Sequence, residues 1–131
     1  MTAKVAYLSQ AWLDLQQAAG GALPEQPGAT ARVQHVVSGG PEGEARYCLT
    51  ITDGRLAAAV VGDDPDADVV LTHTYADATQ IAQGALDANV AFMQGRVKVV
   101  GSMGHVMALM PLTQSEAYRA ALAEVSSQTQ Y

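Results

Sequence analysis

The sequence predicts an α+β domain in which helices pack on one face of a five-stranded, mostly antiparallel sheet. Apolar residues recur every three or four positions near both ends of the chain, as on one face of a helix, and alternate at every second position between them, as along strands. The chain has 131 residues, which suits one domain that buries about two-thirds of its unfolded surface. We therefore expect a single domain over residues 1–131, with its core at 30–125.

The first predicted element is an amphipathic helix over residues 2–19. Its apolar face carries Val5, Leu8, Trp12 and Leu15. Gly20-Gly21 is expected to end it, because glycine tolerates the left-handed backbone found just after a helix.

Alternating apolar residues then predict four strands, near residues 32–37, 45–52, 56–60 and 69–71. Asp53-Gly54 is the strongest hairpin signal, and glycine- and proline-containing turns at 38–43 and 62–65 separate the other strands. Strands joined by such short turns predict an antiparallel meander.

Helical spacing resumes after the fourth strand. We expect helices at 74–84, 87–93, 103–110 and 113–125, with a fifth strand at 96–100. Thr74 with Asp77, Asp87, and the capping box Thr113-Gln-Ser-Glu116 are the expected helix starts. Gly95 and Pro111 are the expected stops.

Composition and charge restrict the partners and the compartment. Apolar residues make up 49% of the chain, the formal charge is −6, and the few basic residues form no cluster. These properties argue against a nucleic-acid partner and against tight docking on anionic membranes. Cys48 is the only cysteine and no secretion signal is evident, so we expect a cytoplasmic protein.

Four of the five methionines, Met93, Met103, Met107 and Met110, fall within residues 84–110. Methionine is unbranched and polarizable, so it lines surfaces that adapt to irregular shapes, whereas a rigid core favours Leu, Ile and Val. On the last turns of this segment the methionines are spaced to share one helical stripe. The segment therefore predicts a cavity for variable apolar ligands.

The same segment resembles the signature of the sterol carrier protein 2 family of lipid-binding domains. The resemblance rests on these elements in order: Gly84, Leu86, Ala91-Phe92-Met93-Gln94-Gly95, Arg96-Val97-Lys98-Val99, Gly101 and the apolar helix from Met103. It covers roughly residues 30–125. One departure is Ser102, where the family often has an acidic residue.

The resemblance implies an apolar tunnel between the sheet and the later helices, holding a fatty acid, a fatty acyl group or a sterol-like lipid. It implies that the last helix, around Tyr118 and Leu122, closes one mouth. The implied lining residues are Ile81, Leu86, Phe92, Met93, Val97, Val99, Met103, Val106, Met107, Met110, Tyr118 and Leu122. A charge at Met107 is expected to weaken lipid uptake.

Other candidate chemistry is weaker. His35, His73 and His105 lack metal-ligand spacing and are expected to be structural, although His105 could donate to a lipid carboxylate. Cys48 alternates away from its apolar neighbours, as a structural thiol would. We therefore expect no metal, no cofactor and no catalysis. The leading hypothesis is a non-catalytic lipid carrier, with transient membrane contact and homodimerisation left open; the alternative is an interaction module whose groove grips a partner helix or a second copy.

Overall fold

The computed structural model describes residues 4–41 and 43–131. Along the chain the elements are β1 (Val5–Ala6), α1 (Gln10–Gly21), β2 (Ala31–Gly40), β3 (Gly43–Thr52), β4 (Arg55–Val61), β5 (Val69–Thr74), α2 (Tyr75–Ala82), α3 (Ala88–Met93), β6 (Lys98–Gly101), α4 (Met103–Thr113), α5 (Glu116–Ser127) and β7 (Thr129–Gln130). The predicted order of helices and strands is confirmed from α1 to α5, whereas the short strands β1 and β7 were not predicted.

The main sheet has the strand order β4-β3-β2-β5-β6. The β2–β3, β3–β4 and β5–β6 pairs are antiparallel, whereas β2 and β5 run parallel with Val33 beside Val69. The sheet is therefore mixed but mostly antiparallel, as predicted.

The predicted four-strand meander is wrong at its last step, because β5 pairs with β2 and not with β4. The loop after β4 returns the chain across the sheet, and Asp68 fastens it there. The Asp68 carboxylate accepts a 2.8 Å hydrogen bond from the Arg32 N–H, and the Asp68 N–H donates one of 2.8 Å to the Arg32 carbonyl. The short turn signal at 62–65 could not reveal this change of partner.

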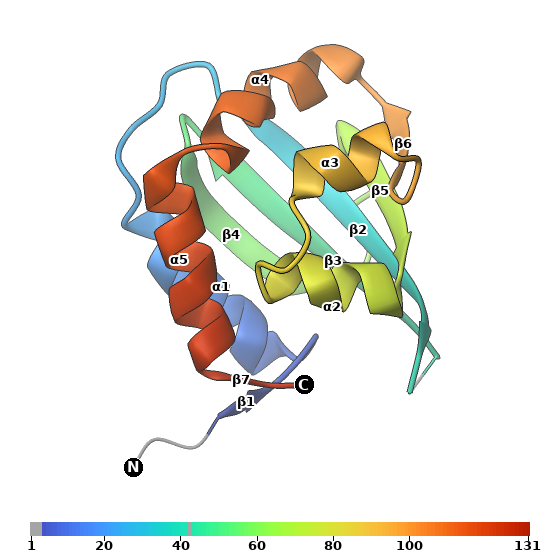
Figure 1. The fold of residues 1–131 in the computed structure, drawn as a ribbon. Helices are drawn as coiled ribbons and strands as arrows, with labels where there is room; N and C mark the ends of the chain where they lie inside the picture. Colours follow the sequence, from blue (N-terminus) through green and yellow to red (C-terminus); the bar gives the residue numbers. More distant parts are fainter. Residues whose placement is uncertain (1–3, 42) are drawn as a thin grey trace.

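The helices cover one face of the sheet, with α2, α3 and α4 across it and α1 and α5 side by side at one edge (Figure 1). The main buried cluster joins α1, the sheet, α2 and α5. Its members are Trp12, Leu13, Val37, Tyr47, Ala59, Ala78 and Val125. A smaller cluster of Leu23, Ala29 and Leu112 lies under the start of α5 and the end of α4.

The first helix begins later than predicted. Residues 5–6 form β1, which pairs in parallel with β7, and the Val5 N–H donates to the Gln128 carbonyl at 2.9 Å. Helix α1 starts only after Ser9, whose hydroxyl accepts from the Trp12 N–H. Predicted helical positions 2 and 3 lie outside the described residues. This small sheet joins residues 5–6 to residues 129–130 (Figure 1).

Two of the three predicted caps are confirmed and one is wrong. Thr74 accepts from the Asp77 N–H and Asp87 accepts from the Asn89 N–H, as expected. Ser115, rather than Thr113, caps α5 by accepting from the Tyr118 N–H at 3.2 Å. The cap moves because α4 continues through Pro111 to residue 113; proline there forgoes one helical hydrogen bond without breaking the last turn.

Candidate functional site

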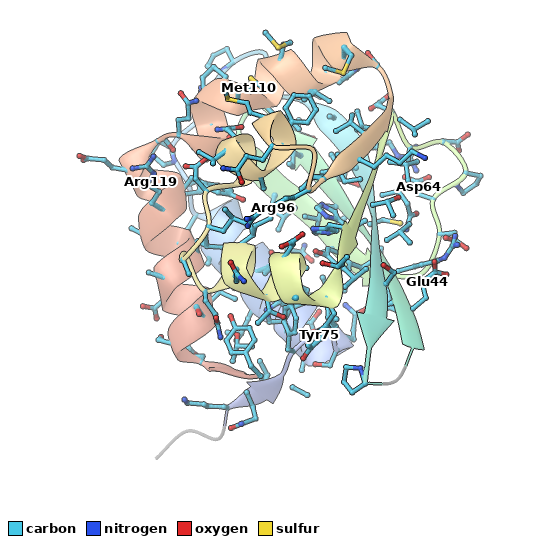
Figure 2. The ribbon with its side chains drawn as sticks, turned by 45° about the vertical axis from the view of Figure 1, so that its right-hand side comes forward. Glu44, Asp64, Tyr75, Arg96, Met110 and Arg119 are labelled. Carbon is cyan, nitrogen blue, oxygen red and sulfur yellow. The ribbon has the colours of Figure 1, made fainter. Side chains whose placement is uncertain are left out.

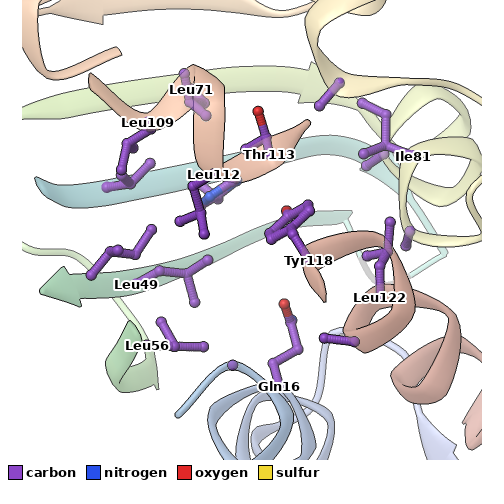
Figure 3. A pocket seen from close by; sticks show the side chains of 18 of the residues that line it. Gln16, Leu49, Leu56, Leu71, Ile81, Leu109, Leu112, Thr113, Tyr118 and Leu122 are labelled. Carbon is purple, nitrogen blue, oxygen red and sulfur yellow. The ribbon is translucent and has the colours of Figure 1, made fainter. Parts of the chain in front are cut away.

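A cavity of about 240 Å³ lies between the helix-covered face of the sheet and the helices (Figure 3). Strands and their flanks contribute Val33, His35, Tyr47, Leu49, Ile51, Leu56, Val69, Leu71, His73, Val97 and Val99. Helices α1 to α5 contribute Trp12, Gln16, Ala19, Gly20, Ala78, Ile81, Ala82, Ala88, Asn89, Phe92, Val106, Leu109, Met110, Leu112, Thr113, Tyr118, Ala121, Leu122 and Val125. The alternation of each strand selects which side chains reach the cavity.

The cavity wall is apolar and uncharged. Among the described residues that line it there is no Asp, Glu, Lys or Arg. Charged side chains lie on the outside: Glu44 and Arg119 project away from the body of the molecule (Figure 2). Within the described residues, no three His, Cys, Asp or Glu side chains gather as potential metal ligands. The wall is therefore suited to hydrocarbon, whose burial is favourable and does not depend on direction.

Eight of the twelve predicted site residues lie around this cavity. They are Ile81, Phe92, Val97, Val99, Val106, Met110, Tyr118 and Leu122. They come from α2, α3, the β6 region, α4 and α5, so the tertiary fold brings residues from one long stretch of sequence around a single space. Figure 3 shows Tyr118 between Ile81 and Leu56 in this space.

The other four predicted residues are placed elsewhere. Met93, Met103 and Met107 are 79%, 46% and 58% exposed and are not among the lining residues. Leu86 borders a separate surface hollow beside Asp87.

The methionines of the fourth predicted helix were expected to face the cavity together, but they do not. Helix α4 turns Val106, Leu109 and Met110 toward the cavity and leaves Met103 and Met107 outside. Almost every residue of this helix is apolar, so spacing alone could not decide which side would face inward.

The sequence analysis missed several polar side chains that line the cavity, among them Trp12, Gln16, His35 and His73. Five of their nitrogen atoms are buried without a hydrogen-bond partner among the described residues: Trp12 Nε1, Gln16 Nε2, His35 Nδ1, and Nδ1 and Nε2 of His73. His35 and His73, expected to be structural, thus lie in the cavity wall, and these ring nitrogens have no partner among the described residues. A signal did exist, because apolar residues stand two positions before each histidine, Val33 before His35 and Leu71 before His73, and side chains two positions apart share one face of a strand.

Both buried imidazoles are neutral at pH 7. Burial, reinforced by nearby His73, lowers the pKa of His35 to about 3. Burial also lowers the pKa of His73, and it raises the pKa of Tyr47 well above its ordinary value. The His35 ring stacks on Tyr47 with centroids 4.6 Å apart and lies 5.8 Å from the His73 ring. The cluster can thus donate and accept hydrogen bonds without carrying charge.

The remaining candidates of the sequence analysis lie away from the cavity. The His105 Nδ1 is 2.7 Å from the Ser102 hydroxyl, and its other ring nitrogen faces Asp68 at 3.8 Å. Cys48 lies on the opposite side of its strand from Tyr47, where its thiol donates to Gln34 at 3.0 Å. Burial raises the pKa of that thiol, which therefore stays protonated.

Fold and cavity define a class of protein: a small α+β domain whose sheet and helices surround an apolar, uncharged space. Residues 13–114 match the SCP-2 sterol transfer family, and the chain belongs to that family. The predicted resemblance is thereby confirmed. Over 77 residues, or 58% of the chain, it is 32% identical to sterol carrier protein 2 of Gallus gallus. The match spans 14% of the length of that relative.

Solved structures agree on the fold. The crystal structure of sterol carrier protein 2 superposes with a TM-score of 0.66 at 16% identity, covering 95% of this chain and 99% of the other. Palmitated SCP2L2 from Aedes aegypti, solved in solution, gives a TM-score of 0.65 at 16% identity, covering 81% and 94%. None of the helices in residues 4–41 and 43–131 is long and apolar enough to cross a membrane.

Proposed function

We propose that this chain is a non-catalytic carrier that encloses a lipid, such as a fatty acid, a fatty acyl group or a sterol-like molecule, in the cavity under its helices. The observation that carries the proposal is the uncharged apolar wall contributed by the sheet and by all five helices. Burying each methylene there is worth about 0.8 kcal/mol relative to water. The family's association with sterol transfer and the palmitated relative support this choice of ligand class.

The size of the cavity suggests that loading expands it. About 240 Å³ is smaller than the roughly 300–1,000 Å³ usual for small-molecule sites. Helices α3 and α4 are joined by a hydrogen bond of 3.1 Å from the Asn89 amide to the Thr113 hydroxyl. We infer that these two helices move outward together when a long ligand enters.

The outer side of the same helices supports transient membrane contact. Met93, Met103 and Met107 are exposed there, and the basic residues Arg96 and Lys98 lie between them in the sequence. Exposed apolar side chains beside cations suit an anionic lipid surface. The overall charge of −6 keeps that contact weak, which suits a carrier that must leave the membrane again.

A matched pair of substitutions on α4 tests the carrier function. Met110 lines the cavity, whereas Met107, three residues earlier on the same helix, lies outside it. Met110→Glu places a charge in the apolar wall and is expected to lower the affinity for a fluorescent fatty acid at least about tenfold. Met107→Glu is the control: because Met107 faces outward, this variant, which the sequence alone predicted to weaken uptake, should bind like the unchanged protein. Thermal melts establish that both variants are folded.

Three results would count against the carrier. The first is that the purified protein yields no lipid on extraction and mass spectrometry and takes up no fluorescent fatty acid. The second is that Met110→Glu and Met107→Glu take up the fluorescent fatty acid equally well. The third is that light scattering and a pull-down find the protein bound to a partner protein, and that uptake of the fluorescent fatty acid needs this partner. That result would favour the interaction module instead.

A further inference from the structure

The two edges of the main sheet differ in how their backbone groups are bonded. At the β4 edge the glutamines of α1 bond the outward groups: Gln10 accepts from the Val61 N–H at 3.1 Å and donates to the Ala59 carbonyl at 3.0 Å. Gln17 donates to the Ala57 carbonyl at 2.9 Å. Because α1 packs along β4, no further strand can join the sheet at this edge.

The β6 edge is open. It lies on the side of the sheet away from α1 and α5 (Figure 1). Within the described residues, the backbone of residues 98–101 has no hydrogen-bond partner outside β5. Lys98, Val100 and Gly101 are exposed, Val100 by 56%. An edge strand of this kind presents unpaired N–H and C=O groups with which another strand can pair.

The two faces of β6 restrict how a second copy of the chain could pair with it. Val99 lines the cavity, so Lys98 and Val100 point to the face of the sheet without helices. There Val100 lies beside Val70, and Lys98 lies beside Thr72. Residues directly opposite each other in an antiparallel pair share one face. Pairing with one Val100 opposite the other therefore keeps the helices of both copies on one side.

This register is also complementary in charge. A lysine on an edge strand usually hinders pairing, and Lys98 forms no ion pair among the described residues. With the two Val100 residues opposite each other, Lys98 lies opposite Ser102 of the second copy and not opposite the other Lys98. Ser102 is next to Asp68, because its N–H donates to the Asp68 carbonyl at 3.0 Å. Each lysine thus gains an acidic neighbour, and the two-fold symmetry repeats the pair.

We propose that β6 is a self-association edge, through which two copies of this chain pair antiparallel and join their five-stranded sheets into one. Main-chain hydrogen bonds and the contact between the two Val100 side chains stabilise the dimer, and Lys98 with Asp68 fixes its register. The strand has only four residues and each copy carries a charge of −6, so the dimer is weak and forms at high protein concentration. The inference goes beyond the carrier function, since each copy keeps its own cavity.

Sedimentation velocity of the ligand-free protein from about 10 µM to about 1 mM tests the association. The expected result is a monomer–dimer equilibrium that weakens as salt is added. Lys98→Glu should weaken the dimer about tenfold, because it places a carboxylate near Asp68 of the other copy. Lys4→Glu is the control: it makes the same change of charge at the only other lysine and should leave the dimer unchanged.

Cysteine cross-linking tests the register. Val100→Cys places two thiols opposite each other, where the Cα atoms of an antiparallel pair are about 4.5–5.5 Å apart and a disulfide can form. Val60→Cys is the control, because Val60 is 54% exposed and lies beside Cys48 at the covered β4 edge. Mild oxidation should link Val100→Cys at least about tenfold faster than Val60→Cys. The buried Cys48 is common to both variants.

Three results would overturn the self-association edge. The first is a chain that stays monomeric at about 1 mM. The second is a dimer that Lys98→Glu and Lys4→Glu weaken equally, or that Met107→Glu abolishes, since the interface would then lie elsewhere. The third is equal cross-linking of Val100→Cys and Val60→Cys. Thermal melts establish that the variants are folded. Because association is measured without ligand, its failure would leave the carrier function intact.

Discussion

Buried neutral His35 should make the ligand-free protein lose stability as the pH falls. In the unfolded chain a histidine has a pKa near 6.5, whereas burial holds the pKa of folded His35 at about 3. Between these values the unfolded state binds a proton that the folded state does not, so acid favours unfolding. The stability contribution is complete above about pH 6.5 and is lost progressively toward pH 3.

The size of this effect follows from linkage. Each pH unit below 6.5 costs about 1.4 kcal/mol for one such group, so His35 alone removes about 2 kcal/mol between pH 7 and pH 5. His73 acts in the same direction, because its pKa is also lowered by burial. Two kilocalories are a large part of the roughly 5–15 kcal/mol that stabilise a typical domain.

Urea unfolding followed by tryptophan fluorescence at pH 7 and pH 5 measures the effect. His35→Phe keeps a ring against Tyr47 and removes the titrating group, so its free energy of unfolding should fall about 2 kcal/mol less than that of the unchanged protein over this range. His105→Phe, outside the cavity, serves as the control and should retain the full pH dependence. Equal pH dependence in the unchanged protein and in His35→Phe would refute the assignment of His35 as a buried neutral group.

Two further predictions concern the fold, and both are measured by urea unfolding. Gly28 and Gly101 both have positive φ, but only at Gly101 would a Cβ strike another group, the Asp68 carbonyl oxygen. Gly28→Ala should therefore cost about 1–2 kcal/mol from the backbone alone, and Gly101→Ala should cost clearly more; equal losses would contradict the close approach of β6 to Asp68. Ser115→Ala should cost about 1 kcal/mol by removing the cap of α5, and a neutral result would argue that Thr113 caps this helix after all.

Local patterns in the sequence were sufficient for much of the fold. The change between helical and alternating spacing predicted the order of elements, and the caps at Thr74 and Asp87 were visible because a cap needs only residues within one turn. The ordered motif from Gly84 to Met103 identified the family. Of the twelve lining residues that the resemblance implied, eight lie around the cavity.

Tertiary structure decided what depends on residues far apart in the chain. The pairing of β5 with β2 is set by long-range contacts such as that of Asp68 with Arg32. A local turn signal cannot predict such contacts. The rotation of α4 was open because its residues are apolar on nearly all sides, so packing against the sheet chose Met110 over Met107. His35 and His73 become neighbours only because their strands lie side by side. Sequence spacing shows which face a side chain takes, and only the folded chain shows what it meets there.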